Sequence, residues 1–579
     1  MRAGEGSLES RWRDVHGNVR ILLLTHGFNS LTQRLYVELA EAGHELSVEY
    51  DIDAAVTREA VALYRPDLVL APYLRRAIPA DVWSTLPCLI VHPGPPGDRG
   101  PAALDRAILA GEPAWGVTLL QAEAELDAGP VWAAATFPMR AATKSSLYRH
   151  EVTEAAVRAV FAALARYPDW CAGRWRPERV PLQPLRPAVR PEERAIDWAR
   201  DDTATVLRKA ASADGSPGVV DSMLGRACRL FDLRPYPAGG PPGALLGRAG
   251  EALVRATVDG AVRIGHLRVE EAQSFKLPAT LALPEAIELP ELPDAVADIR
   301  YEEAAGVGHL YFEFYNGAMG TAACARLTAA YRQVLARPTR VIVLHGGPDF
   351  FSNGLDLNRI EAAASPADES WRNIEAMDDL CEAILRTDDR LTVAALAGNA
   401  GAGGAFLALA ADLIWARSGV VLNPHYLNMG NLYGSEFWTY TLPRRLGETA
   451  ARALMRSRLP LGTAAALRLG FIDAHFGNDV GSFRAETHRR ATELAHAADY
   501  PARLAEKRAR RAADEAAKPL AAYRAGELTE MRRNFYGFDV SYHVARQRFV
   551  HKTPHAWTPR HLARHRETDW LVPKVDSSS

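Results

Sequence analysis

The sequence lacks the cysteine pattern of a disulfide framework. Its 579 residues include five cysteines, which are far apart and form no CxxC pair. A small, odd and scattered set of thiols argues against disulfide scaffolding and against a zinc site built from thiolates, and it fits a reducing compartment. We therefore expect a cytoplasmic protein without a bound metal.

The chain also lacks an excess of one charge and a long hydrophobic run. Its formal net charge is -2, so it has no overall field that would recruit nucleic acid or an anionic membrane. The apolar run at residues 19–24 is shorter than a secretory signal core, and no run approaches the roughly 20 apolar residues that cross a bilayer. Small molecules are the expected ligands, with neither nucleic acid nor a membrane as partner.

What the chain has is length and a regular βα rhythm. A chain of 579 residues predicts two to four domains, since single cores stop growing well below that size. Between residues 19 and 137, short apolar runs alternate with helix-like stretches, which predicts βαβ units and a parallel sheet. Ligands of such sheets bind in loops beyond the carboxyl ends of strands, where residues 27–29 and 92–94 lie.

Two proline-rich stretches divide the rest of the chain. Residues 181–192 and 281–294 both read as linkers, because they carry several prolines and no packing period. We expect domains over residues 1–185, 190–280 and 297–579, with 281–296 as the second linker. Glycine and proline punctuate short β-type runs in the middle domain, which predicts a small β-barrel, whereas the last returns to a βα rhythm with a long helical region at 485–535.

A candidate site begins at His92, which ends a β-type run inside the loop HPGPPGDRG (92–100). Asp127 lies in the turn LDAG (126–129), also after a predicted strand. A histidine beside a carboxylate can stabilise an oxyanion and move protons, as formyl transfer from an amine carrier requires. On the residues alone, a strand cap and a turn cap remain the alternative interpretation.

Residues 90–132 resemble the folate-dependent formyltransferases, including methionyl-tRNA formyltransferase, and residues 194–220 resemble the start of that family's C-terminal barrel. The resemblance covers about residues 19–275 and implies 10-formyltetrahydrofolate as the formyl donor. It implies an Asn–His–Asp catalytic set, of which His92 and Asp127 are present. Ile90 takes the Asn position at the substrate site, and the loop before Arg99 is one residue shorter. Either another donor substitutes for the amide, or the acceptor and geometry differ.

A second candidate site combines FSNGLDL (351–357) with AGAGGAFLALAADL (400–413). Glycine-rich loops let two peptide N–H groups hold an acyl oxygen while negative charge develops. The two motifs resemble the halves of the oxyanion hole in the crotonase (enoyl-CoA hydratase) family, over about residues 297–500. The resemblance implies a CoA thioester as ligand. It assigns the oxyanion hole to the N–H groups of Leu355 and Gly403, with Gly354 and Gly404 at the substrate site.

The two glutamates that hydratases use are absent. Their positions hold Phe406 and, approximately, His425, so alkene hydration is not expected. The nearby segment 423–447 instead supplies Tyr426, Glu436 and Tyr440. A phenol and a carboxylate can donate and accept protons at a small acyl carbon.

The fusion of both halves, together with NPHY and GSE in the second, resembles the HypX/HoxX family of nickel-iron hydrogenase maturation factors. This resemblance implies formyl transfer from 10-formyltetrahydrofolate to CoA, followed by decarbonylation of formyl-CoA to carbon monoxide and CoA. It assigns the decarbonylating pair to Tyr426 and Glu436, and it makes other maturation proteins candidate partners. The expected fold is α/β and multidomain: a Rossmann-like formyltransferase domain, an OB-like barrel, and a crotonase domain with C-terminal helices.

Two other functions stay open. One is a formyltransferase coupled to CoA-thioester hydrolysis or isomerisation, giving formate or a formylated metabolite. The other is a non-catalytic maturation scaffold with degenerate domains. The absent Asn and glutamates favour the scaffold, whereas the retained His92, Asp127, Leu355 and Gly403 argue against it.

The C-terminal region carries four histidines whose spacing suggests a metal site. Prolines interrupt the set, and no carboxylate or cysteine completes it. We therefore expect these side chains to be solvated. They are His551, His555, His561 and His565.

Overall fold

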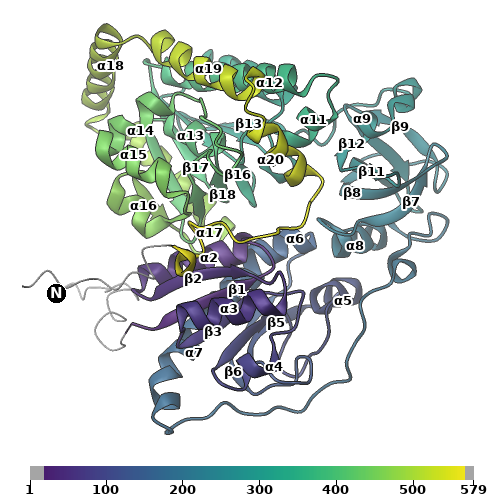
Figure 1. Cartoon of the computed structure of the whole chain (residues 1–579). Helices are drawn as coiled ribbons and strands as arrows, with labels where there is room; N and C mark the ends of the chain where they lie inside the picture. The colour runs from purple at the N-terminus through teal and green to yellow at the C-terminus, as the bar shows by residue number, and fades with distance from the viewer. Residues whose placement is uncertain (1–17, 568–579) are drawn as a thin grey trace, which may run out of the picture. The chain divides into compact units, whose positions relative to one another are not determined.

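The computed structural model describes residues 18–567, which form two compact units (Figure 1). The first unit contains the described residues up to Glu270, residues 278–293 and the described residues from Pro554 onward. The second contains residues 271–277 and 294–553. No helix among the described residues is long and apolar enough to cross a membrane.

The first unit opens with a six-stranded sheet in the order β2-β1-β3-β4-β5-β6. Its strands are β1 (Arg20–Thr25), β2 (Glu45–Tyr50), β3 (Leu68–Tyr73), β4 (Cys88–His92), β5 (Ala114–Gln121) and β6 (Val131–Pro138). Strands β1 to β4 are parallel, as the βα rhythm predicts, but β5 and β6 are antiparallel to their neighbours. The prediction of a parallel sheet is wrong for these two strands; the nine residues between β5 and β6 are too few for the crossover of roughly a dozen or more residues that a parallel pair needs.

Helices cover this sheet. They are α2 (Ser30–Glu41), α3 (Ala54–Tyr64), α4 (Ala80–Trp83), α5 (Ala103–Ala110), α6 (Lys144–Leu147) and α7 (Thr153–Cys171). The loop after β1 has a local role at Asn29, whose side chain accepts a hydrogen bond of 2.9 Å from Thr32 N and so caps α2.

The proline-rich stretch after α7 is not a free linker. Gln183 N donates to Gly97 O at 2.9 Å, and Arg186 N donates to Arg99 O at 3.2 Å. The stretch therefore packs on the loop at 92–100. Prolines remove backbone donors without preventing such contacts, so the predicted boundary near residue 185 lies within ordered structure.

The middle of the first unit is an antiparallel sheet in the order β7-β8-β11-β10-β9. Its elements are α8 (Thr203–Ala213), β7 (Val219–Met223), β8 (Arg226–Tyr236), β9 (Leu245–Ala249), β10 (Ala252–Ala256), β11 (Ala261–Val269), β12 (Leu277–Pro278) and α9 (Ala279–Ala282). The predicted linker 281–296 largely belongs here, because Leu283 and Ala286 are fully buried in this core and Arg248 N donates to Pro290 O at 2.8 Å. Its apolar residues pack although its prolines and acids suggested a linker.

The second unit is built on a six-stranded sheet in the order β13-β14-β15-β17-β19-β22, parallel except for the β13–β14 pair. These strands are β13 (Ile299–Ala304), β14 (Val307–Phe312), β15 (Val341–His345), β17 (Leu391–Leu396), β19 (Leu413–Arg417) and β22 (Ala474–Phe476). A smaller sheet has the order β16-β18-β20-β21. Its strands are β16 (Phe350–Ser352), β18 (Asn399–Gly401), β20 (Val421–Asn423) and β21 (Leu461–Gly462).

The helices of the second unit surround these sheets. They are α10 (Thr321–Leu335), α11 (Leu357–Ala362), α12 (Pro366–Leu385), α13 (Gly403–Leu409), α14 (Trp438–Leu446), α15 (Glu448–Ser457), α16 (Thr463–Leu469), α17 (Val480–His496), α18 (Tyr500–Ala517), α19 (Leu520–Tyr536) and α20 (Ser541–Val550). Helix α19 packs against both α12 and α14. This packing brings the end of the unit onto the segment that carries Glu436.

The chain beyond Pro554 returns to the first unit, so the predicted domain 297–579 is wrong for this segment among the described residues. Strand β2 is the edge of its sheet, and Val48 N donates to Leu562 O at 3.0 Å. An edge strand with unpaired donors is stabilised by such a cover. The carboxylate of Glu49 on β2 is buried, and a buried charge requires partners.

His565 supplies one of those partners, which corrects the expectation that it is solvated. It is fully buried, with Nε2 2.9 Å from Glu49 Oε2 and Nδ1 2.7 Å from Ser47 Oγ. Thr558 and Arg566 also donate to Glu49. Burial alone would raise the pKa of Glu49, but these hydrogen bonds outweigh burial and hold that pKa below its ordinary value.

Replacing His565 tests this cover. We expect His565→Ala to destabilise the first unit by about 1–3 kcal/mol, because a buried carboxylate loses a hydrogen-bond partner. Thermal unfolding of the variant should show a lower midpoint than the wild type, whereas Arg560→Ala, on an exposed residue of the same segment, should not. An unchanged midpoint for His565→Ala would show that the tail adds no stability.

Candidate active sites

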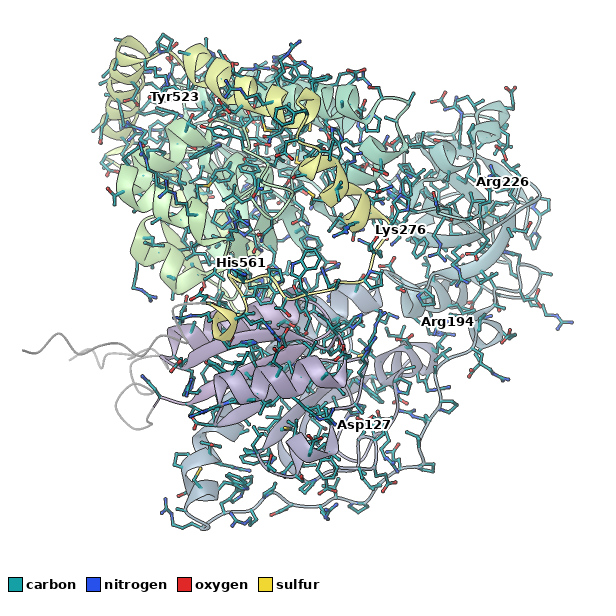
Figure 2. The ribbon with its side chains drawn as sticks, in the orientation of Figure 1. Asp127, Arg194, Arg226, Lys276, Tyr523 and His561 are labelled. Carbon is teal, nitrogen blue, oxygen red and sulfur yellow. The ribbon has the colours of Figure 1, made fainter. Side chains whose placement is uncertain are left out.

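The first candidate site lies around His92 at the end of β4. The ring is buried, with Nε2 2.9 Å from Asp98 Oδ2 and Nδ1 3.7 Å from Asp127 Oδ2. Asp127 lies in the turn between β5 and β6 (Figure 2), and its Oδ2 accepts a hydrogen bond of 3.0 Å from Gly100 N. The two sequence-predicted residues therefore lie side by side, with a third acid beside them.

Asp98 is the residue that the sequence reasoning missed. Its carboxyl group contacts His92 through one oxygen and Arg186 through the other. Burial alone would raise the pKa of Asp98, but these two partners outweigh burial and hold that pKa below its ordinary value. The signal was present in the sequence, because Asp98 belongs to the same loop motif as His92.

Ile90, two residues before His92 on β4, is half-buried and pairs with Leu120 on β5. It packs against the apolar cluster beneath the sheet. An isoleucine offers no hydrogen-bond donor, so this position cannot supply the amide that the resemblance places there.

The second candidate site depends on close backbone approaches. A side chain at Gly354 would begin 3.1 Å from Gly403 N, and one at Gly404 would begin 2.1 Å from Ser352 O. Residues 352–354 and 403–404 therefore touch, which brings together the two halves that the motifs predicted. Leu355 follows Gly354 directly, so its peptide lies next to this contact.

Tyr426 and Glu436 meet beside these glycines. Tyr426 Oη lies 2.5 Å from Glu436 Oε2, and both side chains are buried. The other oxygen, Glu436 Oε1, has no hydrogen-bond partner among the described residues, and it lies 2.1 Å from where a side chain at Gly403 would begin. An unpartnered carboxyl oxygen thus faces the predicted oxyanion hole.

Two further carboxyl groups hold Glu436 in place. Asp378 on α12 accepts a hydrogen bond of 2.8 Å from Glu436 N. Glu527 on α19 accepts from Phe437 N at 2.9 Å and from both Thr439 N and Thr439 Oγ1 at 2.8 and 2.6 Å. We refer to Asp378, Glu436 and Glu527 as the carboxyl cluster. They are 0%, 1% and 1% exposed, respectively.

These hydrogen bonds to Asp378 and Glu527 explain an unusual backbone conformation at residues 436 and 437. Glu436 and Phe437 have φ values of 62° and 60°, a left-handed conformation that is uncommon for side chains of this size. Such residues persist where the surroundings over-determine them. Here the N–H groups of Glu436 and Phe437 are bound by carboxylates from two different helices, α12 and α19.

Burial governs the protonation of the carboxyl cluster. It raises the pKa of Glu436 to about 8, with a further contribution from the charge of Asp378. Burial likewise raises the pKa of Glu527 to about 8 and that of Asp378 to about 7. The pKa of Tyr426 lies well above its ordinary value, because the phenol is buried and next to Glu436. Groups with pKa values near neutrality are suited to proton transfer.

The residue at the first lost glutamate position packs against the predicted pair. Phe406 is fully buried and stacks on Tyr426, with ring centroids 5.0 Å apart. Tyr440, the third predicted residue, has different partners: its hydroxyl lies 2.8 Å from Asp514 Oδ2 and 2.8 Å from Arg511 Nη1. Tyr426 and Glu436 alone form the predicted pair.

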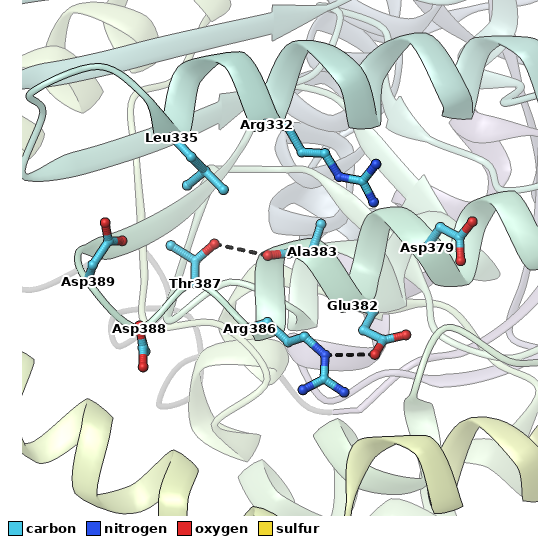
Figure 3. Close-up of a pocket in the computed structure, with 9 residues that line it drawn as sticks. All are labelled: Arg332, Leu335, Asp379, Glu382, Ala383, Arg386, Thr387, Asp388 and Asp389. Atoms are coloured by element: carbon cyan, nitrogen blue, oxygen red, sulfur yellow. Dashed lines mark hydrogen bonds and ion pairs between the residues drawn. The ribbon is translucent and has the colours of Figure 1, made fainter.

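A surface pocket of about 580 Å³ lies elsewhere in the second unit (Figure 3). Its lining residues are Arg332, Leu335, Asp379, Glu382, Ala383, Arg386, Thr387, Asp388 and Asp389. Four acids face two arginines in this lining, which disfavours an anionic ligand such as CoA. The pocket does not include the Tyr426–Glu436 pair.

Three histidines lie close together in the second unit: His309 on β14, His345 on β15 and His488 on α17. Their nitrogens lie within 4.8 Å of one another, and His309 Nδ1 is 3.0 Å from His345 Nε2. The rings of His309 and His488 stack at 3.9 Å with 8° between their planes. Imidazoles bind a metal through lone pairs in the ring plane, and parallel stacked rings do not direct these lone pairs to one point. We interpret the group as stacked and hydrogen-bonded core packing.

Comparison with known proteins resolves the family. Residues 315–560 match the enoyl-CoA hydratase/isomerase family, and residues 37–164 match the formyl transferase family. A hydrogenase maturation factor HoxX from Bradyrhizobium diazoefficiens is 55% identical over 95% of this chain and 97% of its own length. The chain belongs to the HypX/HoxX family of hydrogenase maturation factors. The family and the fold class expected from the sequence are confirmed.

A solved structure and a more distant relative are also similar to this chain. The crystal structure of HypX from Aquifex aeolicus in complex with tetrahydrofolic acid is 48% identical, covers 95% of this chain and 99% of that one, and superposes with a TM-score of 0.92. Methionyl-tRNA formyltransferase from Ralstonia nicotianae is 28% identical over 38% of this chain and 69% of its own length. This formyltransferase therefore matches only part of the chain.

The stacking of Tyr426 can be tested at Gly434. A side chain there would begin 2.1 Å from the Tyr426 ring, and Gly434 has a φ of 89°. We expect Gly434→Ala to cost about 1–3 kcal/mol of stability, because it overpacks a buried ring. Gly447→Ala is the matched control: its φ is 80°, but nothing lies within 4 Å. A Gly434→Ala unfolding midpoint no lower than that of Gly447→Ala would contradict the packing.

Proposed function

We propose that the chain makes carbon monoxide from a one-carbon unit for hydrogenase maturation. The first site transfers the formyl group of 10-formyltetrahydrofolate to CoA, and the second decarbonylates formyl-CoA to carbon monoxide and CoA. The observation that carries the proposal is the buried Tyr426–Glu436 pair, whose free carboxyl oxygen faces Gly403. The tetrahydrofolic acid complex of the Aquifex relative supports folate as the donor.

In the first step, the CoA sulfur attacks the formyl carbon and the C–N bond to the folate breaks. The thiol proton moves to the folate nitrogen, which gives formyl-CoA and tetrahydrofolate. His92 is the group that relays this proton, since it lies between two carboxylates at the carboxyl end of β4. General acid–base catalysis of this kind contributes about 10²- to 10⁴-fold to rate.

In the second step, Glu436 Oε1 takes the formyl proton and the C–H electron pair stays on carbon. The C–S bond breaks with its electron pair on sulfur, so carbon monoxide leaves. Tyr426 gives its hydroxyl proton to the sulfur and regains one from Glu436 through their 2.5 Å hydrogen bond. The peptide N–H groups of Leu355 and Gly403 bind the acyl oxygen. The products are carbon monoxide and CoA.

Water would divert the reaction to formate, so the second step needs a dry site. Phe406 and Phe437 are fully buried around Tyr426 and Glu436. These apolar neighbours favour decarbonylation over the alternative function, hydrolysis of the CoA thioester to formate. The hydrogen bonds from Glu436 N to Asp378 and from Phe437 N to Glu527 also argue against a degenerate scaffold, because they hold a strained backbone that binding alone would not require.

Glu436→Gln tests the second step. The amide keeps the shape of the side chain but does not accept the formyl proton. With 10-formyltetrahydrofolate and CoA supplied, we expect formyl-CoA to form and accumulate, while carbon monoxide, measured by haemoglobin absorbance, falls at least about 100-fold. Glu448→Gln, on an exposed ion pair of α15, should release the gas at the wild-type rate. Unchanged gas release from Glu436→Gln would eliminate the assignment.

Gas release should also depend on pH. Glu436 must be ionised to accept a proton, and its pKa is raised to about 8. The rate of carbon monoxide release from formyl-CoA should therefore rise between about pH 6.5 and 9 with an apparent pKa that belongs to the whole carboxyl cluster. A rate that falls over this range would show that the protonated form acts instead. Alkali also hydrolyses the thioester and releases CoA. The assay therefore measures carbon monoxide and not free CoA.

A further inference from the structure

The His92 site is built differently from the Asn–His–Asp set that the formyltransferase resemblance implies. Residues 90 and 92 face the same side of β4, since side chains alternate along a strand. Ile90 therefore lies where a polar neighbour of His92 would be, and it offers neither a donor nor an acceptor. The polar partner of the ring comes from the loop instead.

That partner is Asp98, and the contact is built into the loop. Asp98 Oδ2 lies 2.9 Å from His92 Nε2, and Asp98 is 2% exposed. A side chain at Gly94 would begin 2.4 Å from Asp98 Oδ2 and 2.5 Å from His92 Nε2. Only glycine at position 94 lets the carboxylate and the ring approach in this way.

Arg186 fixes the other oxygen of the same carboxylate. Its guanidinium donates to Asp98 Oδ1, and its backbone N donates to Arg99 O at 3.2 Å. Both side chain and backbone of Arg186 therefore bind the loop that carries Asp98. A carboxylate held at both oxygens has one orientation, and so does the ring to which it is hydrogen-bonded.

We propose that Asp98 and Arg186 are positioning residues for formyl transfer: Arg186 holds Asp98, and Asp98 fixes His92 with a hydrogen on Nε2. A carboxylate only accepts hydrogen bonds, so the nitrogen facing it must carry the hydrogen. Nδ1 then keeps its lone pair. It lies 3.7 Å from Asp127 Oδ2, beyond hydrogen-bond distance, and is the nitrogen left to take the thiol proton. This inference rests on the proposed function of the first site.

A double-mutant cycle on the full chain tests the proposal. Release of tetrahydrofolate from 10-formyltetrahydrofolate is measured with CoA present, because this signal does not depend on the second site. We expect Asp98→Ala to lower kcat about 100-fold while KM for the folate stays within about twofold, as for loss of a group that orients a catalytic base. Arg186→Met should lower kcat about tenfold.

The combined variant distinguishes positioning from general damage. Because Arg186 acts through Asp98, we expect Asp98→Ala with Arg186→Met to be no slower than Asp98→Ala alone. Arg179→Met is the matched control: it breaks the ion pair between the exposed Arg179 and Glu123 in the same region and should keep wild-type kcat.

Three results would overturn the inference. These are an Asp98→Ala kcat within about threefold of wild type, a combined variant slower by the product of the two single effects, or a rise in KM without a fall in kcat. If Asp98→Ala does not fold, as judged by tetrahydrofolate binding, Arg186→Met alone must show the fall in kcat at constant KM. A wild-type protein that releases no tetrahydrofolate would instead refute the proposed function, and the positioning role with it.

Discussion

The second half of the molecule depends on burying three carboxyl groups next to one another. Asp378 and Glu527 accept the hydrogen bonds that hold Glu436 and Phe437 in a left-handed backbone conformation. These acceptors come from α12 and α19, so both helices must be packed for Glu436 to point toward Gly403. The C-terminal helices are therefore part of the site. Burying carboxyl groups raises their pKa values toward neutrality, which makes Glu436 suited to exchanging a proton.

Carboxyl groups at the two candidate sites have pKa values shifted in opposite directions. At the first, cationic or hydrogen-bonding partners hold the pKa of Asp98 below its ordinary value, so the carboxylate stays charged and orients His92. At the second, burial and the charge of Asp378 raise the pKa of Glu436. A fixed charge suits a residue that positions another, whereas a labile proton suits a residue that reacts. The difference matches the two steps of the proposed reaction.

Much of this organisation was readable from the sequence because its signals are local. The β-type run that ends at His92 is strand β4 in the structure, and the glycine motifs predicted the approach of Gly354 to Gly403. Long-range partners were not readable. Glu527 binds Phe437 across 90 residues, and His565 binds Glu49 across 516. No local pattern distinguishes such a glutamate or histidine from a solvated one.

The central claim is that Tyr426 and Glu436 convert formyl-CoA to carbon monoxide rather than to formate. The most direct measurement supplies formyl-CoA carrying a ¹³C-labelled formyl group to the purified chain, without folate, and follows the label in a single turnover. The account predicts that the label leaves as carbon monoxide with one equivalent of free CoA thiol. Recovery of the label as formate would contradict it.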